Sequence, residues 1–376
     1  MFQKKGLRAW TAIVFVAALL LAGCGDSGGS DDDATTDPTN GSGGTSAAAP
    51  EGDQTDSIAG ISGSIKASGA SFPDAFYQEA IAGLGEVAPD LTVTYNAIGS
   101  SSGREEFAQN LNDFAGTDSL VKDEEGIDAD SFFYIPSTAA SVAVAYNLPG
   151  VDEVKLDGPA IAKIFQREIT TWNDPAIAAL NDGVELPDTA ITVARRADGS
   201  GTTKNFTKFL ETAAPDDWKL GSDDTVEWPS DTEGGQQNPG VAQIITSTEG
   251  AVGYIDFGNA SELGMQMALV ANQEGNFVAP SVEATQAALE GAELADDLTY
   301  DPLFGPGADA YPITAPTYIM VRAAYPDAAL GEAVVEFVKW LITDGADTYA
   351  VEVGYAPVPE SFRTAAFESL DQVELG

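Results

Sequence analysis

The sequence predicts an α/β fold arranged as two domains or two lobes, and two observations support this. The chain has 376 residues, 44% of them hydrophobic, which exceeds one domain of ordinary size and can bury a sizeable core. In three places a strand, a loop rich in Gly and Ser, and a helix follow one another. This alternation is typical of α/β proteins, which bind ligands at the carboxyl ends of their strands.

Each strand–loop–helix unit has its own sequence signals. In the first unit, a short strand is expected around Ile65. Its helix is expected to start near Pro73, with Ser71 or Phe72 at the cap, because proline fits a first helical turn.

In the second unit, an alternating strand from Leu91 leads to a helix expected to carry Glu105 and Glu106 in its first turn. In the third, a strand from Ile191 leads to an amphipathic helix that runs through Leu210. Further elements are expected by composition and period: strands at 137–148 and 315–322, helices at 158–169, 281–292 and 329–354, and a connection at 301–312.

The charge of the chain limits its partners. There are 17 Lys+Arg against 59 Asp+Glu, a formal net charge of −42. Long-range repulsion opposes nucleic acid and anionic membrane surfaces as partners. An anionic ligand would need its own local donors, since surface charge beyond about 10 Å is screened. No cofactor is expected, and the chain is expected to be a monomer.

The N-terminus has the pattern of a lipoprotein export signal. Basic residues precede an apolar run from Trp10 to Leu21, which is short for a membrane span of about 20 residues. Leu-Ala-Gly-Cys then resembles the bacterial lipobox, in which Cys24, the only cysteine, would carry the lipid (palmitate among its acyl groups). An ordinary signal peptide with an incidental cysteine is the alternative. We expect residues 1–23 to be the signal peptide and the protein to lie outside the cytoplasm, attached to the membrane only through Cys24.

Residues 24–59 are expected to form a flexible acidic linker. They consist largely of Gly, Ser, Asp, Thr, Ala and Pro. So few large apolar side chains cannot offset the entropy of ordering the chain.

The segment RRADGSGTTKNF, at 195–206, places two adjacent arginines before a loop of Gly, Ser and Thr. In so acidic a chain they either serve a ligand or neutralise nearby carboxylates, and composition leaves both open. Helix N-termini present unpaired backbone N–H groups, so three converging ones would form a cradle for an anion. Arg196 could add a bidentate, charge-assisted pair.

Four segments of the chain resemble the ligand-binding segments of bacterial ABC-transporter phosphate-binding proteins. They are ASGASFP at 67–73, AIGSSSG at 97–103, DFAGTD at 113–118 and RRADGSGTT at 195–203. The resemblance runs from about Ile61 almost to the C-terminus. It implies a two-lobed periplasmic-binding-protein fold of type II, each lobe a mixed sheet flanked by helices, with the ligand in the cleft between the lobes. The lobes are expected at 60–147 plus 313–376 and at 148–312.

The resemblance also implies a function and a set of ligand-binding residues. The protein would bind inorganic phosphate outside the cytoplasmic membrane and deliver it to the permease of an ABC transporter. Phosphate would be bound by the hydroxyl and backbone groups of the first, second and fourth segments, by a buried aspartate, and by an arginine held by a second aspartate: Ser71, Phe72, Ser100, Asp118, Arg196, Asp198, Ser200, Gly201 and Thr202.

Asp118 is the most informative of these residues. Phosphate near neutral pH keeps a proton and sulfate keeps none, so a buried acceptor favours phosphate. A site built around a ligand O–H rejects the analogue that lacks it by roughly 10⁴–10⁵-fold. Arg195 is expected on the other side of its strand from Arg196. Arg104 could add positive potential to the site or pair with an acid on its helix.

Two other functions compete with phosphate binding. Residues 99–103 match G-x-S-x-G, the nucleophile elbow of hydrolases, but a chain without histidine has no Ser–His pair. It also has no His/Cys metal cluster. We therefore expect no catalytic residue and no metal ligand, and a phosphate-releasing hydrolase is disfavoured. Binding of another oxyanion is the remaining alternative.

Overall fold

The computed structural model describes residues 54–376, so Cys24 and residues 1–23 lie outside the described residues. The last residues of the predicted linker form a short helix, α1 (Gln54–Ile58). The helix is held against the rest of the fold by Ile58, whose side chain is completely buried in the main hydrophobic core. None of the helices in residues 54–376 is long and apolar enough to cross a membrane.

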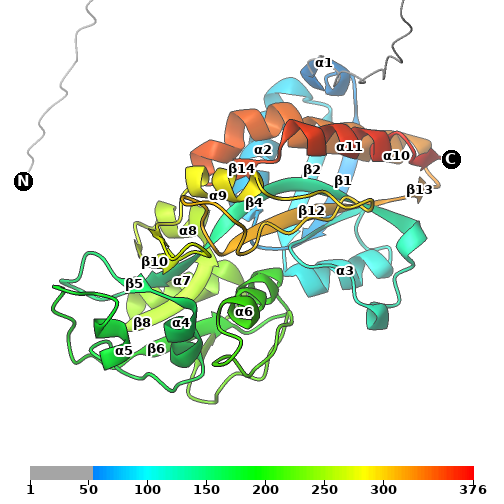
Figure 1. Ribbon diagram of the computed structural model, residues 1–376. Coiled ribbons are helices and arrows are strands. Elements are labelled where there is room, and N and C mark those ends of the chain that lie inside the picture. Colours follow the sequence, from blue (N-terminus) through cyan, green and yellow to red (C-terminus); the bar gives the residue numbers. More distant parts are fainter. Residues whose placement is uncertain (1–53) are drawn as a thin grey trace, which may run out of the picture. The chain divides into compact units, whose positions relative to one another are not determined.

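A mixed ten-stranded sheet is the framework of the structure (Figure 1). Its main path has the order β2-β1-β3-β12-β4-β8-β6-β7, and β14 and β9 add to β4. The strands are β1 (Gly63–Gly69), β2 (Leu91–Ala97), β3 (Phe114–Thr117), β4 (Phe132–Tyr146), β6 (Thr192–Arg196), β7 (Glu233–Gly235), β8 (Ala251–Asp256), β9 (Gln266–Met267), β12 (Thr314–Arg322) and β14 (Ala356–Pro357).

The long strand β4 joins two parts of this sheet. Its residues 132–141 pair with β12, and its residues 142–146 pair with β8, antiparallel in both cases. We call β1, β2, β3, β12 and the start of β4 the first half-sheet, and β6, β7, β8 and the end of β4 the second half-sheet. Pairing is parallel between β1 and β2, β1 and β3, β6 and β7, and β6 and β8. The register of β12 and β4 shifts between Thr317 and Tyr318, which marks a bulge.

Helices cover both half-sheets. In Figure 1, α2, α10 and α11 lie together on one side of the first half-sheet, and α3 lies on the other. The helices are α2 (Asp74–Val87), α3 (Ser100–Ala108), α4 (Gly158–Phe165), α5 (Pro175–Ala178), α6 (Gly201–Ala213), α7 (Gln237–Ser247), α8 (Phe257–Glu262), α9 (Val282–Leu289), α10 (Ala328–Trp340) and α11 (Glu360–Leu370).

Smaller elements complete the chain. Two small sheets contain β5 (Lys155–Leu156), β10 (Leu269–Ala271) and β11 (Phe277–Val278), and β13 (Ala324–Tyr325) and β15 (Glu374–Leu375). The 3₁₀-helices are η1 (Asp123–Glu125), η2 (Ala129–Ser131) and η4 (Val351–Val353), and η3 (Leu341–Ala350) is a π-helix.

The three predicted strand–loop–helix units are present, with corrections at two helix starts. The helix α2 has Pro73 at its N-cap rather than Ser71 or Phe72, because the polar groups of those two residues bond elsewhere. The helix α3 begins at Ser100, so Glu105 and Glu106 lie beyond its first turn. Gly99, at φ 94°, makes the turn in a single residue, which lets the helix start early.

The remaining predicted elements differ mainly in extent. The strand expected at 137–148 starts earlier, at Phe132, and the helix expected at 158–169 ends at Phe165. The single helix expected at 329–354 is α10 followed by the π-helix η3 and the 3₁₀-helix η4. Within this stretch Thr343 donates from its hydroxyl to the carbonyl of Lys339, a bond that competes with regular helix geometry.

Candidate functional site

Polar side chains from both half-sheets meet where β1, β2, β3 and β6 end. The segments that follow the two half-sheets come into direct contact at Ser100. Its Oγ accepts hydrogen bonds from the backbone N–H of Asp118 and of Gly201, each at 3.2 Å. A Cβ on Gly201 would lie 2.6 Å from the Cβ of Asp118, so glycine is required at this contact. Ser100 and Asp118 follow strands of the first half-sheet and Gly201 begins α6 of the second, so the site lies between the two.

Asp118 is buried and bonded to hydroxyl donors. Thr317 donates from its Oγ1 to Asp118 Oδ1 at 2.6 Å, and Ser100 donates from its Oγ to Oδ2 at 3.4 Å. Asn205 donates to the Asp118 carbonyl at 2.7 Å from across the site. Burial raises the pKa of Asp118 to about 7, against the lowering effect of the Thr317 hydrogen bond and the positive charge of Arg196. An acid with such a pKa can hold or accept a proton at neutral pH.

Arg196 is held in a fixed orientation with its side chain almost wholly buried. Asp198 accepts from both Nε, at 2.9 Å, and Nη2. Nη1 donates to Asn238 Oδ1 at 3.0 Å and lies 3.4 Å from Thr202 Oγ1. Tyr254 accepts from the Arg196 backbone N–H at 3.1 Å. The guanidinium is therefore a preorganised donor at this position.

The other predicted residues lie around the Asp118 carboxyl and the Arg196 guanidinium. Ser200 caps α6, accepting from the Thr203 N–H at 3.2 Å. Ser71 Oγ accepts from the Asn238 N–H at 3.3 Å, which ties the loop after β1 to the start of α7. Phe72 is completely buried, and its carbonyl accepts from the Tyr355 hydroxyl at 2.6 Å.

Sequence reasoning missed two residues that organise the site. Asn238 bonds to Arg196 and Ser71 and donates to Asp256 Oδ2 at 2.7 Å. Thr317 supplies the shortest hydrogen bond to Asp118. Asn238 and Thr317 both lie outside the four segments that resemble ligand-binding segments, so no local signal pointed to them.

The two other arginines have distinct environments. Arg195 bonds to the Thr232 hydroxyl and to the Arg196 carbonyl, so its guanidinium lies apart from that of Arg196. Arg104 is paired, as one of the two expectations held, but not with an acid of its own helix. Its partners are Glu125 and Asp224, because Glu105 is solvent-exposed and Glu106 accepts from Ser68 instead.

A cavity of about 730 Å³ opens beside Asp118. Residues from both half-sheets line it, among them Lys122 after β3, Lys204 on α6, and Tyr318 on β12. The cavity gives solvent a route toward the site from this side.

The pKa of Asp118 makes the stability of the anion-free protein depend on pH. The unfolded chain loses this proton near its ordinary pKa of 3.8, and the folded chain keeps it to about pH 7. The contribution of Asp118 to the free energy of unfolding is therefore largest below pH 4 and is lost as the pH rises to 7. In the parent protein this makes the free energy of unfolding decrease as the pH rises. Asp118→Asn should make that slope less steep, by up to about 1.4 kcal/mol per pH unit. Urea titrations between pH 5 and 7 measure this, and parallel slopes would contradict it.

Comparison with known proteins identifies the family. The model of the PBP superfamily domain matches residues 38–344. Phosphate-binding protein PstS 3 of Mycobacterium leprae is 36% identical over 288 residues, which cover 73% of this chain and 78% of that protein. Phosphate-binding protein PstS 2 of Mycobacterium tuberculosis is 32% identical over 378 residues, 96% of this chain and 97% of that protein.

Solved structures agree with the fold. A high affinity periplasmic phosphate-binding protein, PfluDING, solved with bound phosphate, superposes with a TM-score of 0.68 at 20% identity, covering 84% of this chain and 96% of that one. The phosphate-binding protein of Stenotrophomonas maltophilia gives a TM-score of 0.64 at 23% identity, covering 82% and 94%. The fold is the two-lobed type II fold of periplasmic phosphate-binding proteins. The chain belongs to the PBP superfamily, and within it to the family of the PstS phosphate-binding proteins.

Proposed function

We propose that the protein binds inorganic phosphate outside the cytoplasmic membrane and delivers it to the permease of an ABC transporter. The observation that carries the proposal is the buried carboxyl of Asp118 at the same site as the preorganised guanidinium of Arg196. A site with both an acceptor and a cationic donor suits an anion that keeps a proton. Family membership and the names of the relatives support the same ligand.

In the proposed complex, Asp118 accepts the phosphate hydroxyl and Arg196 donates to the phosphate oxygens, held in place by Asp198. Hydroxyl and backbone N–H groups of the loops supply the other donors. These groups belong to Ser71, Phe72, Ser100, Ser200, Gly201 and Thr202.

We propose that the lobes comprise residues 60–147 plus 313–376 and residues 148–312. The sheet supports a crossing close to this boundary, because β4 pairs with β12 up to residue 141 and with β8 from residue 142, shortly before the first lobe segment ends. Closure of the lobes about this strand would exclude water from the bound anion and present the loaded form to the permease.

Calorimetry of the anion-stripped protein tests the proposal. We expect tight binding of phosphate and binding of sulfate weaker by about 10⁴-fold or more, because sulfate brings no proton to Asp118. Arsenate, titrated in parallel, reports how far the site tolerates a larger protonated oxyanion. Equal affinities for phosphate and sulfate, or no phosphate binding, would overturn it. A phosphomonoester incubated with the protein should not turn over, and release of phosphate would instead favour a hydrolase.

The lipid anchor gives a further prediction. If Cys24 is acylated, Cys24→Ala should release the protein in soluble form or leave it unprocessed. Detergent-phase partitioning of cell extracts measures this, with Ser27→Ala as the control that preserves the cysteine. Partitioning of Cys24→Ala like the parent protein would contradict the anchor. We propose that the lipid is the only membrane contact of the free protein, which acts as a monomer.

A further inference from the structure

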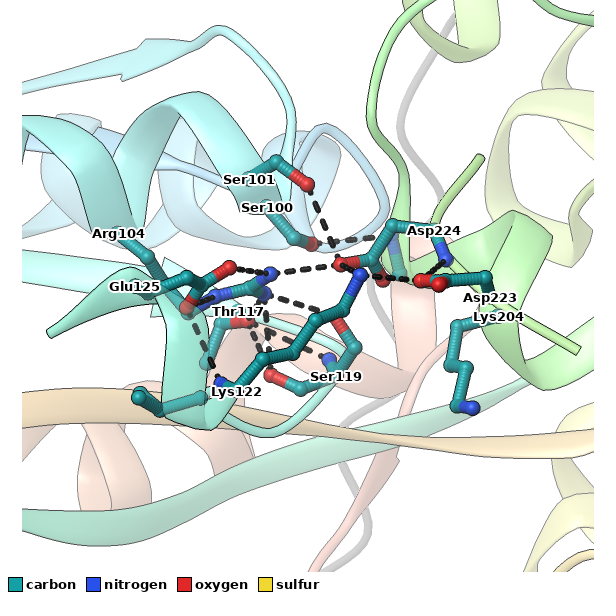
Figure 2. A network of polar contacts seen from close by, with 12 residues as sticks. Ser100, Ser101, Arg104, Thr117, Ser119, Lys122, Glu125, Lys204, Asp223 and Asp224 are labelled. Atoms are coloured by element: carbon teal, nitrogen blue, oxygen red, sulfur yellow. Dashed lines mark hydrogen bonds and ion pairs between the residues drawn. The ribbon is translucent and has the colours of Figure 1, made fainter. Parts of the chain in front are cut away.

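Arg104 is completely buried and lies where the two half-sheets meet (Figure 2). It follows Ser100 by four residues on α3, so both side chains leave the same face of the helix. Nε and Nη2 donate to the two carboxylate oxygens of Glu125 at 2.8 and 2.7 Å. Nη2 also donates to Asp224 Oδ2 at 2.6 Å. Asp224 lies between α6 and β7, so this ion pair crosses from one half-sheet to the other.

The remaining guanidinium nitrogen fixes the backbone that carries Asp118. Nη1 donates to Thr117 Oγ1 at 2.9 Å, to Ser119 Oγ at 2.7 Å and to the Ser119 carbonyl at 3.2 Å. Thr117 and Ser119 are the two neighbours of Asp118 in the chain. Arg104 thus holds the segment on both sides of the proposed proton acceptor.

Asp224 fixes the backbone on the other side of the site, at the start of α6. Its carbonyl accepts from the backbone N–H of Ser200 at 3.0 Å, beside the first turn of α6. Its carboxylate is fully buried and accepts from the Ser101 hydroxyl at 3.2 Å as well as from Arg104. Burial favours a raised pKa, but Arg104, a hydrogen bond from Ser119 and Lys122 hold the pKa of Asp224 below its usual range. Asp224 is therefore a charged group that needs its partners from the first half-sheet.

A second ion pair crosses beside the first. Lys122 contacts Asp223 and lies 3.4 Å from Asp224 Oδ2. Figure 2 shows its side chain reaching toward both aspartates. Lys122 and Asp223 are both partly exposed, so solvent screens this outer pair and its contribution is small.

We propose that Arg104 and Asp224 are positioning residues of the anion site, whose ion pair joins the two lobes over the bound anion and slows its release. The inference rests on the proposed function. Neither residue is among the ligand-binding residues proposed above. Separation of the lobes would leave Arg104 with Glu125 but deprive Asp224 of its partners on the first half-sheet. The pair therefore stabilises the closed form alone, and it must break before the anion leaves.

The test is stopped-flow measurement of phosphate association and dissociation rates in the full protein. Asp224→Asn is the first variant, because Arg104 keeps Glu125 and the first lobe keeps its internal bonds. Arg104→Gln and the double variant complete a cycle. The control is Arg363→Gln, which removes a bidentate pair with Asp347 that lies within residues 313–376. Circular dichroism and melting without anion establish that each variant folds.

We expect each single variant to release phosphate at least about tenfold faster, with the association rate within about twofold of the parent. The double variant should lose less than the product of the two single effects, because both changes break one pair. The control should match the parent. Unchanged release from folded variants, or a loss confined to the association rate, would overturn the inference alone. Failure of the parent protein to bind phosphate would overturn the proposed function and this inference with it.

Discussion

Arg196→Ala should weaken phosphate binding by roughly thirtyfold to several thousandfold. Truncating one member of a buried, hydrogen-bonded charged pair costs about 2–5 kcal/mol, and about 1.4 kcal/mol corresponds to tenfold in affinity. Two effects add in the same direction. The variant loses the donor. It also leaves the Asp198 carboxylate, which accepts two bonds from Arg196 in the parent protein, without a cationic partner beside an anion.

The neighbouring arginine supplies the control for this experiment. Arg195→Ala removes the same charge one residue away, but the Arg195 guanidinium bonds to Thr232 and to a backbone carbonyl. Its effect on affinity should be small, since charge at a distance is screened by salt. Calorimetric titration of both variants at one ionic strength makes the comparison. Equal losses would show that net charge, rather than the position of Arg196, governs binding.

Asp118→Asn should lower the ratio of phosphate to sulfate affinity by at least about tenfold, or ~1.4 kcal/mol. The amide keeps the shape of the side chain, removes its charge and supplies an N–H₂ donor. Phosphate can still bind, because the amide oxygen accepts its proton or the amide nitrogen donates to an oxygen. Sulfate should gain most, because the change removes a repulsive group.

The environment of Asp118 makes this variant a fair test. Thr317 and Ser100 can reorient their hydroxyls to serve an amide, so the packing of the buried site need not change. Both anions are titrated against both proteins at one ionic strength and at one pH above 7, where the Asp118 carboxyl has lost its proton. An unchanged ratio would assign Asp118 a structural role and place selectivity in other residues.

Sequence reasoning predicted the parts of the site whose residues lie close together in short segments of the chain. Arg196 ends a strand, and Ser100 and Gly201 each begin a helix, next to turns whose Gly, Ser and Thr content is visible locally. The pairing of Arg196 with Asp198 spans only two residues. The α/β class was predicted for the same reason, because strand and helix periods are local properties.

The parts that sequence reasoning missed depend on contacts between distant segments. Thr317 reaches Asp118 from 199 residues away, and Asp224 reaches Arg104 from 120 residues away. Periodicity marks Thr317 only as one position of a buried strand. Nothing local distinguishes Asp224 from the other acids of this chain, and only the burial of its carboxylate marks it.

The order of strands in the sheet has a consequence for how the chain folds as it is made. The strand β12 comes from Thr314–Arg322 but lies between β3 and β4, so the first half-sheet stays incomplete until residue 322 has been synthesised. Until then β3 has an open edge, which exposes the nascent chain to aggregation. The strands of the second half-sheet are all available once residue 256 has emerged. The second half-sheet can therefore fold first, although its strands come later in the chain. The first half-sheet, which contains the N-terminal strands, is completed last.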